Sequence, residues 1–338
     1  MKAVHLRRHG PPEVLRIEQV PDPTPGDGQV LVRVQAVGLN YAEVLSRKGL
    51  YGWAPERPYI LGMEGAGVIE AFGRGVAGRE VGEPVLFGAQ CGSYAELIVV
   101  DSAAAFPAVP GFSLDENAAF GVSYLTAWIC LMEMARLRTT DRVLVTAAAG
   151  GLGTAAVQVA SKFGCEVIAL AGSDKKLEKA RELGANVMVR YGDSEFPQRL
   201  AEAVGPAGVD VVLETVGGDV FAACDAVVAP FGRIVVAGYA ELDYKLWNPL
   251  SLWRAWNGRP RMRLESMLRG SKGLLSAHLG YLLQDAALVK RVWSDLSAFA
   301  EEHTIRPVVG HVLTLDEVAA AHRLMESRAS VGKIVLRV

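Results

Sequence analysis

The fold is decided by the stretch from Val143 to Gly164, which reads Val-Leu-Val-Thr-Ala-Ala-Ala-Gly-Gly-Leu-Gly-Thr-Ala-Ala-Val-Gln-Val-Ala-Ser-Lys-Phe-Gly. It starts with β-branched residues and leucine, as a buried strand does, and Gly150, Gly151 and Gly153 then predict a tight turn. Apolar residues recur at helical spacing after the turn. Such glycines let the backbone approach a pyrophosphate, whose charge is stabilised by free amides and the helix dipole. The stretch therefore predicts a dinucleotide site, although a lone glycine turn can also be a plain connection from strand to helix.

Strand-like and helical segments alternate after this turn. The expected strands cover residues 166–171, 186–191, 209–216 and 233–238, and the expected helices cover residues 175–183, 196–204 and 220–228. Repeated alternation at this spacing predicts an α/β fold with a doubly wound parallel sheet of the Rossmann type. In such a sheet the dinucleotide lies across the carboxyl ends of the strands.

Length and composition indicate a globular chain of two domains. The chain has 338 residues, more than a single core of the usual size accommodates. Lysine and arginine number 35 against 37 aspartates and glutamates, so the overall charge does not favour nucleic acid as a partner. We find neither the apolar core of a signal peptide nor an apolar run of membrane-spanning length, which predicts a cytoplasmic protein. Four widely spaced cysteines disfavour a disulfide or zinc framework: Cys91, Cys130, Cys165 and Cys224.

Both ends of the chain are rich in strand patterns. The first 120 residues alternate short apolar runs, such as 30–37, with glycine turns, and they predict a partly open β-barrel. Residues 114–135 then turn helical, with Ser113 as the expected N-cap ahead of Glu116. Residues 305–338 are again strand-rich, which suggests that the tail folds back onto the first domain.

Several segments together resemble the medium-chain dehydrogenase/reductase superfamily, and within it the zinc-independent quinone oxidoreductase branch. They are Gly-Leu-Asn-Tyr-Ala-Glu at 38–43, Gly-Met-Glu-Gly-Ala-Gly-Val at 62–68, the glycine turn at 147–153, Glu-Leu-Gly-Ala at 182–185 and Glu-Ser-Arg-Ala-Ser-Val-Gly-Lys-Ile-Val at 326–335. The stretches Leu-Trp-Arg-Ala-Trp at 252–256 and Ser-Ala-His-Leu-Gly-Tyr-Leu at 276–282 are similar to the VAT-1 group. The resemblance covers nearly the whole chain. It implies a GroES-like catalytic domain at 1–121 and 280–338 and a Rossmann domain at 122–279.

The resemblance also implies chemistry without a metal. At the three positions where zinc-dependent members carry ligands, this chain has Asn40, Met63 and a residue near Val122, none of which is a good zinc ligand. Of the structural zinc lobe only Cys91 is present. We therefore expect hydride transfer from the nicotinamide to a fairly apolar acceptor that is already polarised by conjugation, a quinone or an α,β-unsaturated carbonyl. Reduction of an enoyl thioester is a variant of the same expectation.

Two residues are expected at the reacting centre by resemblance. Asn40 would face the nicotinamide and the reacting carbonyl, and Tyr51 would lie at the mouth of the pocket, where its phenol could donate a hydrogen bond to a developing enolate or quinol oxygen. Each has a structural alternative: Tyr51 as an aromatic anchor of its loop, and Asn40 as an amide that braces its own loop. Glu64 is expected to be structural.

The second strand of the Rossmann domain predicts the choice of cofactor. Where NAD-preferring folds place an acidic residue, this chain has Ala171, so no carboxylate repels a 2′-phosphate. By resemblance, Ser173, Lys176 and Tyr191 hold that phosphate, which favours NADPH. Lys176 could equally be a solvated lysine. The full set of expected cofactor residues is Asn40, Thr126, Ala149, Gly150, Gly151, Leu152, Gly153, Ser173, Lys176, Tyr191, Gly238 and Arg328, although a surface ion pair would also explain Arg328.

The segment from Lys245 to Lys272 interleaves tryptophans with arginines. Such a segment can mark a contact with a membrane surface or an anionic ligand, which would fit a VAT-1-like cofactor-binding protein that acts on lipids. The favoured interpretation is a helical flap over the substrate pocket and a subunit interface, because no amphipathic period holds throughout. By resemblance we expect a homodimer that continues the Rossmann sheet through residues 274–278. A nucleic-acid-binding role is the weakest alternative.

Overall fold

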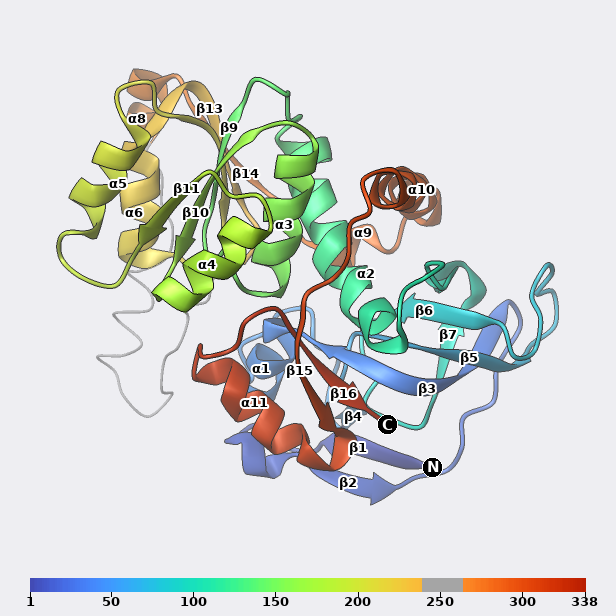
Figure 1. Cartoon of the computed structure of the whole chain (residues 1–338). Helices are drawn as coiled ribbons and strands as arrows, with labels where there is room; N and C mark the ends of the chain where they lie inside the picture. Colours follow the sequence, from blue (N-terminus) through green and yellow to red (C-terminus); the bar gives the residue numbers. More distant parts are fainter. Residues whose placement is uncertain (239–263) are drawn as a thin grey trace. The chain divides into compact units, whose positions relative to one another are not determined.

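The structure is a computed structural model that describes residues 1–238 and 264–338 (Figure 1). The chain divides into two compact units: the first comprises Met1–Leu125 and Leu279–Val338, and the second comprises Thr126–His278. Most of the Trp/Arg-rich segment predicted at 245–272 lies outside the described residues. Among the described residues, no helix combines the length and the apolar character needed to cross a bilayer.

The first unit contains two sheets. The larger has the order β15-β16-β3-β5-β6-β8, with β7 also paired to β3, and the smaller has the order β2-β1-β4. Strand β16 pairs with β3 in antiparallel fashion, with Ile334 opposite Leu39, so the tail of the chain joins the larger sheet that β3 begins. The strands are β1 Lys2–Leu6, β2 Arg16–Gln19, β3 Gln29–Leu39, β4 Tyr59–Ile60, β5 Glu64–Phe72, β6 Pro84–Gly88, β7 Leu97–Asp101, β8 Ala105–Pro107, β15 Val309–Thr314 and β16 Lys333–Arg337.

Local signals in the sequence explain where the helices of this unit begin and end. Helix α2 has the predicted cap, because the Glu116 amide donates to Ser113 Oγ at 3.2 Å and the Ser113 amide donates to Glu116 Oε2 at 2.7 Å. Helix α1 ends at Gly49, whose φ of 77° suits glycine. The helices are α1 Tyr41–Lys48, α2 Leu114–Trp128, α9 Leu279–Leu282, α10 Ala286–Glu302 and α11 Val318–Glu326.

The core of the first unit comes from the alternation of its strands. In β3, Val30, Val32 and Val34 point inward and are almost fully buried, as are Ile334 and Leu336 of β16. Burying such side chains contributes roughly 1.5–3 kcal/mol each before the entropy cost of folding. The tail strand is therefore held by its core contacts as well as by its backbone hydrogen bonds.

The second unit is a six-stranded sheet in the order β11-β10-β9-β12-β13-β14, and every pair is parallel. The order doubles back at β9 and β12, which is the strand order of a doubly wound Rossmann fold. Helices α5 and α6 pack against each other, and α3 lies on the opposite side of the sheet (Figure 1). The strands are β9 Arg142–Val145, β10 Glu166–Ala171, β11 Val187–Arg190, β12 Val209–Glu214, β13 Val228–Val236 and β14 Gly273–Ser276; the helices are α3 Gly151–Lys162, α4 Asp174–Glu182, α5 Phe196–Val204, α6 Gly218–Ala226 and α8 Leu264–Gly270. The predicted α/β fold class is confirmed.

Candidate functional site

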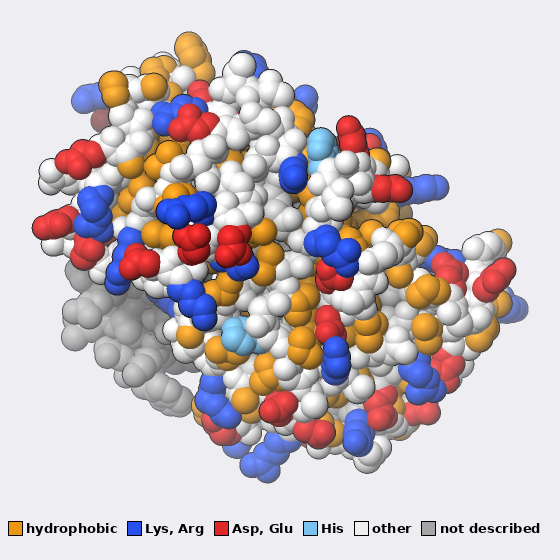
Figure 2. Space-filling view, in the orientation of Figure 1, with side chains coloured by type: hydrophobic (Ala, Val, Ile, Leu, Met, Phe, Trp, Pro, Cys, Tyr) orange, Lys and Arg blue, Asp and Glu red, His pale blue; other side chains and the backbone are white. Residues whose placement is uncertain are grey.

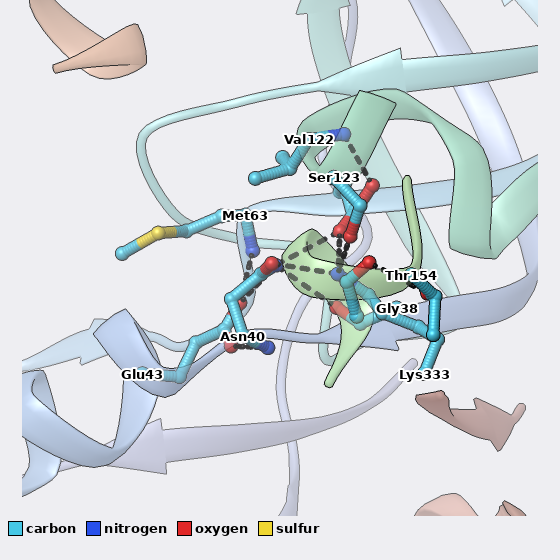
Figure 3. Close-up of polar contacts among 10 residues, drawn as sticks. Gly38, Asn40, Glu43, Met63, Val122, Ser123, Thr154 and Lys333 are labelled. Atoms are coloured by element: carbon cyan, nitrogen blue, oxygen red, sulfur yellow. Dashed lines mark hydrogen bonds and ion pairs between the residues drawn. The ribbon is translucent and has the colours of Figure 1, made fainter. Parts of the chain in front are cut away.

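A cluster of buried polar side chains lies in the first unit, at the point where β16 begins (Figure 3). We call Asn40, Glu43, Glu64, Ser123 and Lys333 the buried polar cluster. The Lys333 Nζ is its centre: it donates to Asn40 Oδ1 at 2.6 Å, to Glu64 Oε1 at 2.6 Å and to Ser123 Oγ at 3.2 Å. Lys333 is 4% exposed and Glu64 is 1% exposed, so this ion pair is shielded from water.

Three elements supply the side chains of this cluster, and one glycine leaves the space that the cluster needs. Glu64 is the first residue of β5, Lys333 is the first of β16, and Asn40 is the last before α1. Gly38, two residues earlier in β3, lies so close that a Cβ there would be 2.9 Å from the Cε of Lys333 and 2.2 Å from the Ala118 carbonyl oxygen. Any side chain at position 38 would therefore displace the cluster.

Both carboxylates of the cluster also accept backbone amides. Glu64 Oε2 accepts the Val122 amide at 2.8 Å. Glu43, which is fully buried, accepts the amide of Asn40, and its other oxygen accepts the Met63 amide at 3.1 Å. Burial raises the pKa of Glu43 to about 8, against the lowering effect of the Lys333 charge. At neutral pH the cluster therefore holds one ion pair and one neutral acid.

The carboxamide of Asn40 is already engaged inside the first unit. Its Nδ2 donates to Glu64 Oε1 at 2.9 Å and to the Gly38 carbonyl at 3.3 Å, while its Oδ1 accepts from Lys333. These contacts support the interpretation of Asn40 as a brace. That Asn40 also faces a nicotinamide is a proposal.

The positions expected to replace zinc ligands do not suit a divalent cation. Asn40 offers an amide oxygen and Met63 a thioether, both poor ligands for zinc, and the Asn40 oxygen already faces the ammonium of Lys333. Among residues 1–238 and 264–338, no three histidine, cysteine, aspartate or glutamate side chains lie close enough together to hold a metal ion. The residues present do not fit a catalytic zinc at these positions, and no step below uses one.

Three aromatic side chains gather near the end of α1. The Tyr51 ring lies 6.4 Å from that of Trp53 and nearly perpendicular to it, and the Trp53 ring lies 6.2 Å from that of Tyr281. Trp53 packs onto Gly280, where a Cβ would be 2.6 Å from the indole. Burial raises the pKa of Tyr51, so its phenol is a hydrogen-bond donor at any physiological pH. Both the proton-donor and the loop-anchor interpretations of Tyr51 are compatible with this position.

The glycine turn of the second unit brings the start of α3 close to the end of β9. Helix α3 starts at Gly151, and the Gly150 that precedes it is extended. A Cβ on Gly153 would lie 2.2 Å from the Ala147 carbonyl oxygen and 2.7 Å from the Ala148 Cα, so only glycine lets helix and strand approach this closely. The Gly150 amide donates to the Ala147 carbonyl at 2.9 Å, so the amides that the helix N-terminus can offer an anion are those of the first residues of α3, Gly151 and Leu152.

The residues predicted to hold a 2′-phosphate come from the carboxyl ends of β10 and β11. Ala171 ends β10, Ser173 caps α4, and Tyr191 follows β11 with its amide donating to the Ala171 carbonyl at 3.1 Å. The Tyr191 ring passes Gly172, where a Cβ would be 3.6 Å away. Asp174 lies in the first turn of α4. Ser173 and Tyr191 thus follow the ends of two neighbouring strands, at the edge where Ala171 stands in place of the usual carboxylate.

The remaining predicted residues come from several parts of the chain, and among them Lys176 adjoins Ser173, whose carbonyl accepts its amide at 3.1 Å. Thr126 is in α2, Lys176 is in the first turn of α4, and Gly238 is the last described residue before the gap. Arg328 follows α11 with a φ of 56°. Sequence reasoning missed Glu43, Ser123 and Lys333. The Asn-x-x-Glu spacing of a capping box could have indicated Glu43.

Comparisons with known proteins cover both units. Residues 26–111 match the family model described as alcohol dehydrogenase GroES-like domain, and residues 151–258 match the one described as zinc-binding dehydrogenase. The synaptic vesicle membrane protein VAT-1 homolog of Rattus norvegicus is 34% identical over 315 residues, which are 93% of this chain and 78% of that protein.

Two solved structures are similar over the full length of the chain. A quinone oxidoreductase from Thermus thermophilus, which was also solved as its complex with NADPH, is 35% identical with a TM-score of 0.82, and all of both chains is covered. An NAD-dependent alcohol dehydrogenase is 32% identical with a TM-score of 0.85, again with all of both chains covered.

Proposed function

The chain belongs to the medium-chain dehydrogenase/reductase superfamily, and we propose that within it the protein is an NADPH-dependent reductase that transfers hydride, without zinc, to a quinone or an α,β-unsaturated carbonyl. The similarity to quinone oxidoreductases supports an oxidoreductase. Our proposal adds three points to this: the reaction uses no metal, the acceptor is a conjugated carbonyl compound, and named residues act on that acceptor.

The observation that carries this proposal is the Lys333 ammonium, 2.6 Å from the amide oxygen of Asn40. Asn40 occupies the position expected to carry the first zinc ligand in zinc-dependent relatives. A buried cation there opposes a second cation. The acceptor must then be a molecule that takes hydride without a Lewis acid, because conjugation already spreads the charge that develops on its oxygen.

The protein's part in this reaction is to bind, orient and donate a hydrogen bond. When bound, the reduced nicotinamide supplies the hydride. The glycine turn holds the cofactor's pyrophosphate, and Tyr51 donates its phenol hydrogen to the acceptor oxygen that gains negative charge. The buried polar cluster fixes the loop before α1, so that the segment leading to Tyr51 keeps its place.

The choice of NADPH over NADH is supported by the strand ends of the second unit. Ser173 and Tyr191 offer hydroxyl groups there, and Ala171 leaves no carboxylate to repel a phosphate. The quinone oxidoreductase from Thermus thermophilus binds NADPH, whereas the other similar structure is of an NAD-dependent enzyme. We therefore treat NADPH as the proposed cofactor and test it against NADH directly.

The test combines binding and turnover. NADPH and NADH are titrated by quenching of tryptophan fluorescence, and loss of NADPH absorbance is then followed with a panel of benzoquinones, naphthoquinones and enones. We expect NADPH to bind at least ~10-fold more tightly, as expected for one good phosphate contact, and at least one acceptor to turn over. Unchanged activity after exhaustive chelation supports zinc-free chemistry. Loss of activity on chelation, restored by added zinc, would contradict it.

A second candidate function follows from the similarity to VAT-1 proteins, because the name of that relative places it at a synaptic vesicle membrane. The contact would be the Trp/Arg-rich segment at 245–272, most of which lies outside the described residues. Flotation with anionic vesicles, compared with neutral vesicles and with a variant that replaces Trp247, Trp253 and Trp256, tests this. Flotation that does not depend on these tryptophans would count against it.

We also propose a homodimer. Strand β14 pairs only with β13 among the described strands and ends the order of the sheet, and an open edge of this kind invites pairing with another chain. A monomer at micromolar concentration in sedimentation velocity would contradict the proposal.

A further inference from the structure

A polar cavity of about 520 Å³ opens in the first unit. Its lining combines the end of β1, the end of α1 and the loop that leads to β4. The charged, imidazole and hydroxyl-bearing residues of this lining are Arg7, His9, Ser46, Tyr51, Glu56, Arg57 and Tyr59. Its volume is in the usual range for small-molecule sites, but such sites are mostly apolar. A polar lining indicates a ligand that carries a polar or charged group.

The positive charge of this cavity is concentrated at Arg57. Arg7 is already paired, with a nitrogen 2.6 Å from Glu18 Oε2. Burial lowers the pKa of His9, and the nearby charge of Arg57 adds to that lowering. Burial raises the pKa of Tyr59, and the charge of Arg57 partly opposes that rise. Over residues 1–238 and 264–338, no hydrogen bond or ion pair engages Arg57.

The other lining groups suit an anion that Arg57 would hold. Ser46, at 1% exposure, and Tyr59, at 9%, place buried hydroxyl groups at the wall. Glu56 is the one carboxylate of the lining, and it opposes an anion. On the face that Figure 2 shows, lysines and arginines are mixed with aspartates and glutamates. Arg57 lines the cavity as an exposed residue, and within residues 1–238 and 264–338 it has no carboxylate partner.

We propose that this cavity binds the carboxylate or phosphate group of a small-molecule acceptor, with Arg57 as its main partner. The proposal rests on the reductase function above and deepens it, because Tyr51 lines the same cavity. The acceptor would then carry an acidic group on the side of its conjugated carbonyl that faces Arg57. Guanidinium groups bind such oxygens with two parallel hydrogen bonds, and they select strongly against an uncharged ester.

The first experiment measures binding alone, with full-length protein and no cofactor. The probes are 4-oxopentanoate and its methyl ester, followed by saturation-transfer NMR; neither probe can be reduced at an alkene or alkylate a cysteine. We expect the acid to bind at least about 10-fold more tightly than the ester. Arg57→Gln should remove this difference, and Glu56→Gln should strengthen binding of the acid about 3-fold, because it removes a like charge.

Arg8→Gln is the matched control, because Arg8 is the chain neighbour of two lining residues and is itself outside the lining. It should leave the affinity unchanged. All these positions are exposed, so the variants are expected to fold. Equal affinity for acid and ester, or an Arg57→Gln variant that binds the acid like the wild type, would overturn the proposal.

The second experiment shows whether the anion is part of the acceptor or a separate ion. It also distinguishes failure of the reductase proposal from failure of the cavity proposal. Turnover of trans-4-oxo-2-pentenoate is compared with that of its methyl ester, with and without inorganic phosphate. If the anion belongs to the acceptor, kcat/KM favours the acid about 10-fold, and phosphate competes. If phosphate binds through Arg57 but the two acceptors turn over equally, the site takes a separate anion and the acceptor assignment is wrong. If Arg57 determines binding yet no acceptor is reduced, the reductase function fails while the cavity assignment holds.

Discussion

The Nζ of Lys333 lies 2.6 Å from the Oε1 of Glu64, although 269 residues separate them in the chain. The pair joins the first residue of β5 to the first residue of β16, and both side chains are buried. Asn40 and Ser123 supply two of the remaining contacts of the ammonium. A pair of this kind is expensive to break, because each partner alone is a charge without solvent.

The first prediction removes one partner of this pair. Lys333→Met leaves the Glu64 carboxylate buried and unpaired, so we expect the free energy of unfolding to fall by about 3–5 kcal/mol. The double variant Lys333→Met with Glu64→Gln should recover much of that loss, since it removes both charges. Urea unfolding measures both, with Arg33→Gln as the control: it breaks an exposed ion pair with Glu70 and should cost less than about 1 kcal/mol. Equal losses in the single and double variants would contradict this account of the cluster.

The second prediction concerns pH. Burial raises the pKa of Glu43 from its ordinary value of 4.5 to about 8, so the folded state keeps a proton that the unfolded state has released. The contribution of Glu43 to stability is therefore complete below about pH 4.5 and is lost as the pH rises to about 8, by at most ~1.4 kcal/mol per pH unit.

The variant Glu43→Gln tests this assignment, because an amide does not titrate in this range. Its stability curve between pH 5 and pH 8 should be flatter than that of the wild type, as measured by thermal unfolding in buffers of matched ionic strength. Parallel curves for the two proteins would assign the pH dependence to other groups.

These two predictions depend on contacts that the sequence indicates only in part. The glycine turn and the strands of the second unit could be predicted, because their signals are local: a run of apolar residues, then glycines at fixed spacing. The Ser113–Glu116 cap was local too, and it is confirmed. The pairing of Lys333 with Glu64 could not be predicted in this way, because a lysine at the start of a strand usually reaches solvent and its partner is distant in the chain.

The aromatic group beside α1 could also be predicted from the sequence only in part. Tyr51 and Trp53 are neighbours in sequence, and the resemblance to a known family directed attention to Tyr51. Tyr281 joins them from the other end of the chain only through the fold, and Gly280 is needed because the indole of Trp53 occupies the space of its Cβ. The cavity at Arg57 likewise combines two separated stretches of the chain, residues 7–9 and 46–59, so composition and periodicity did not reveal it.

The third prediction tests the glycine turn. Gly153→Ala places a Cβ 2.2 Å from the Ala147 carbonyl oxygen, so α3 must move away from its strand. We expect a loss of about 1–3 kcal/mol in stability together with weaker NADPH binding in fluorescence titrations. Gly150→Ala is the control for stability, because its Cβ would meet only the Ala147 oxygen at 3.4 Å and its backbone is extended. If Gly153→Ala binds NADPH and unfolds like the wild type, the close approach of helix and strand is not required.

The fourth prediction concerns the 2′-phosphate. Ser173→Ala and Lys176→Ala should each raise the KM for NADPH about 10-fold, because each removes a proposed hydrogen bond to a charged group, and each should leave the KM for NADH unchanged. Lys175→Ala, the neighbouring lysine of α4, is the control and should affect neither. A variant that raises both KM values equally would show that the residue supports the strand end rather than the phosphate.

The fifth prediction separates the two interpretations of Tyr51. Tyr51→Phe keeps the ring that contacts Trp53 and removes only the hydroxyl. If the phenol donates to the developing oxyanion, kcat/KM for the acceptor should fall about 100-fold, while the Kd for NADPH and the melting temperature stay unchanged. Tyr281→Phe, in the same aromatic group and 57% exposed, should keep full activity.

The pH dependence and the solvent deuterium effect of the wild type and Tyr51→Phe give a further test, because a residue that only packs would change neither. Burial raises the pKa of Tyr51, so the wild-type rate should show no loss from tyrosine ionisation up to about pH 10, the ordinary pKa of a phenol. The residual rate of Tyr51→Phe should depend on water as the donor and respond to solvent deuterium differently from the wild type. If Tyr51→Phe retains full kcat/KM and only Tyr51→Ala loses activity, then the ring anchors its loop, and the hydrogen bond to the acceptor must come from another group.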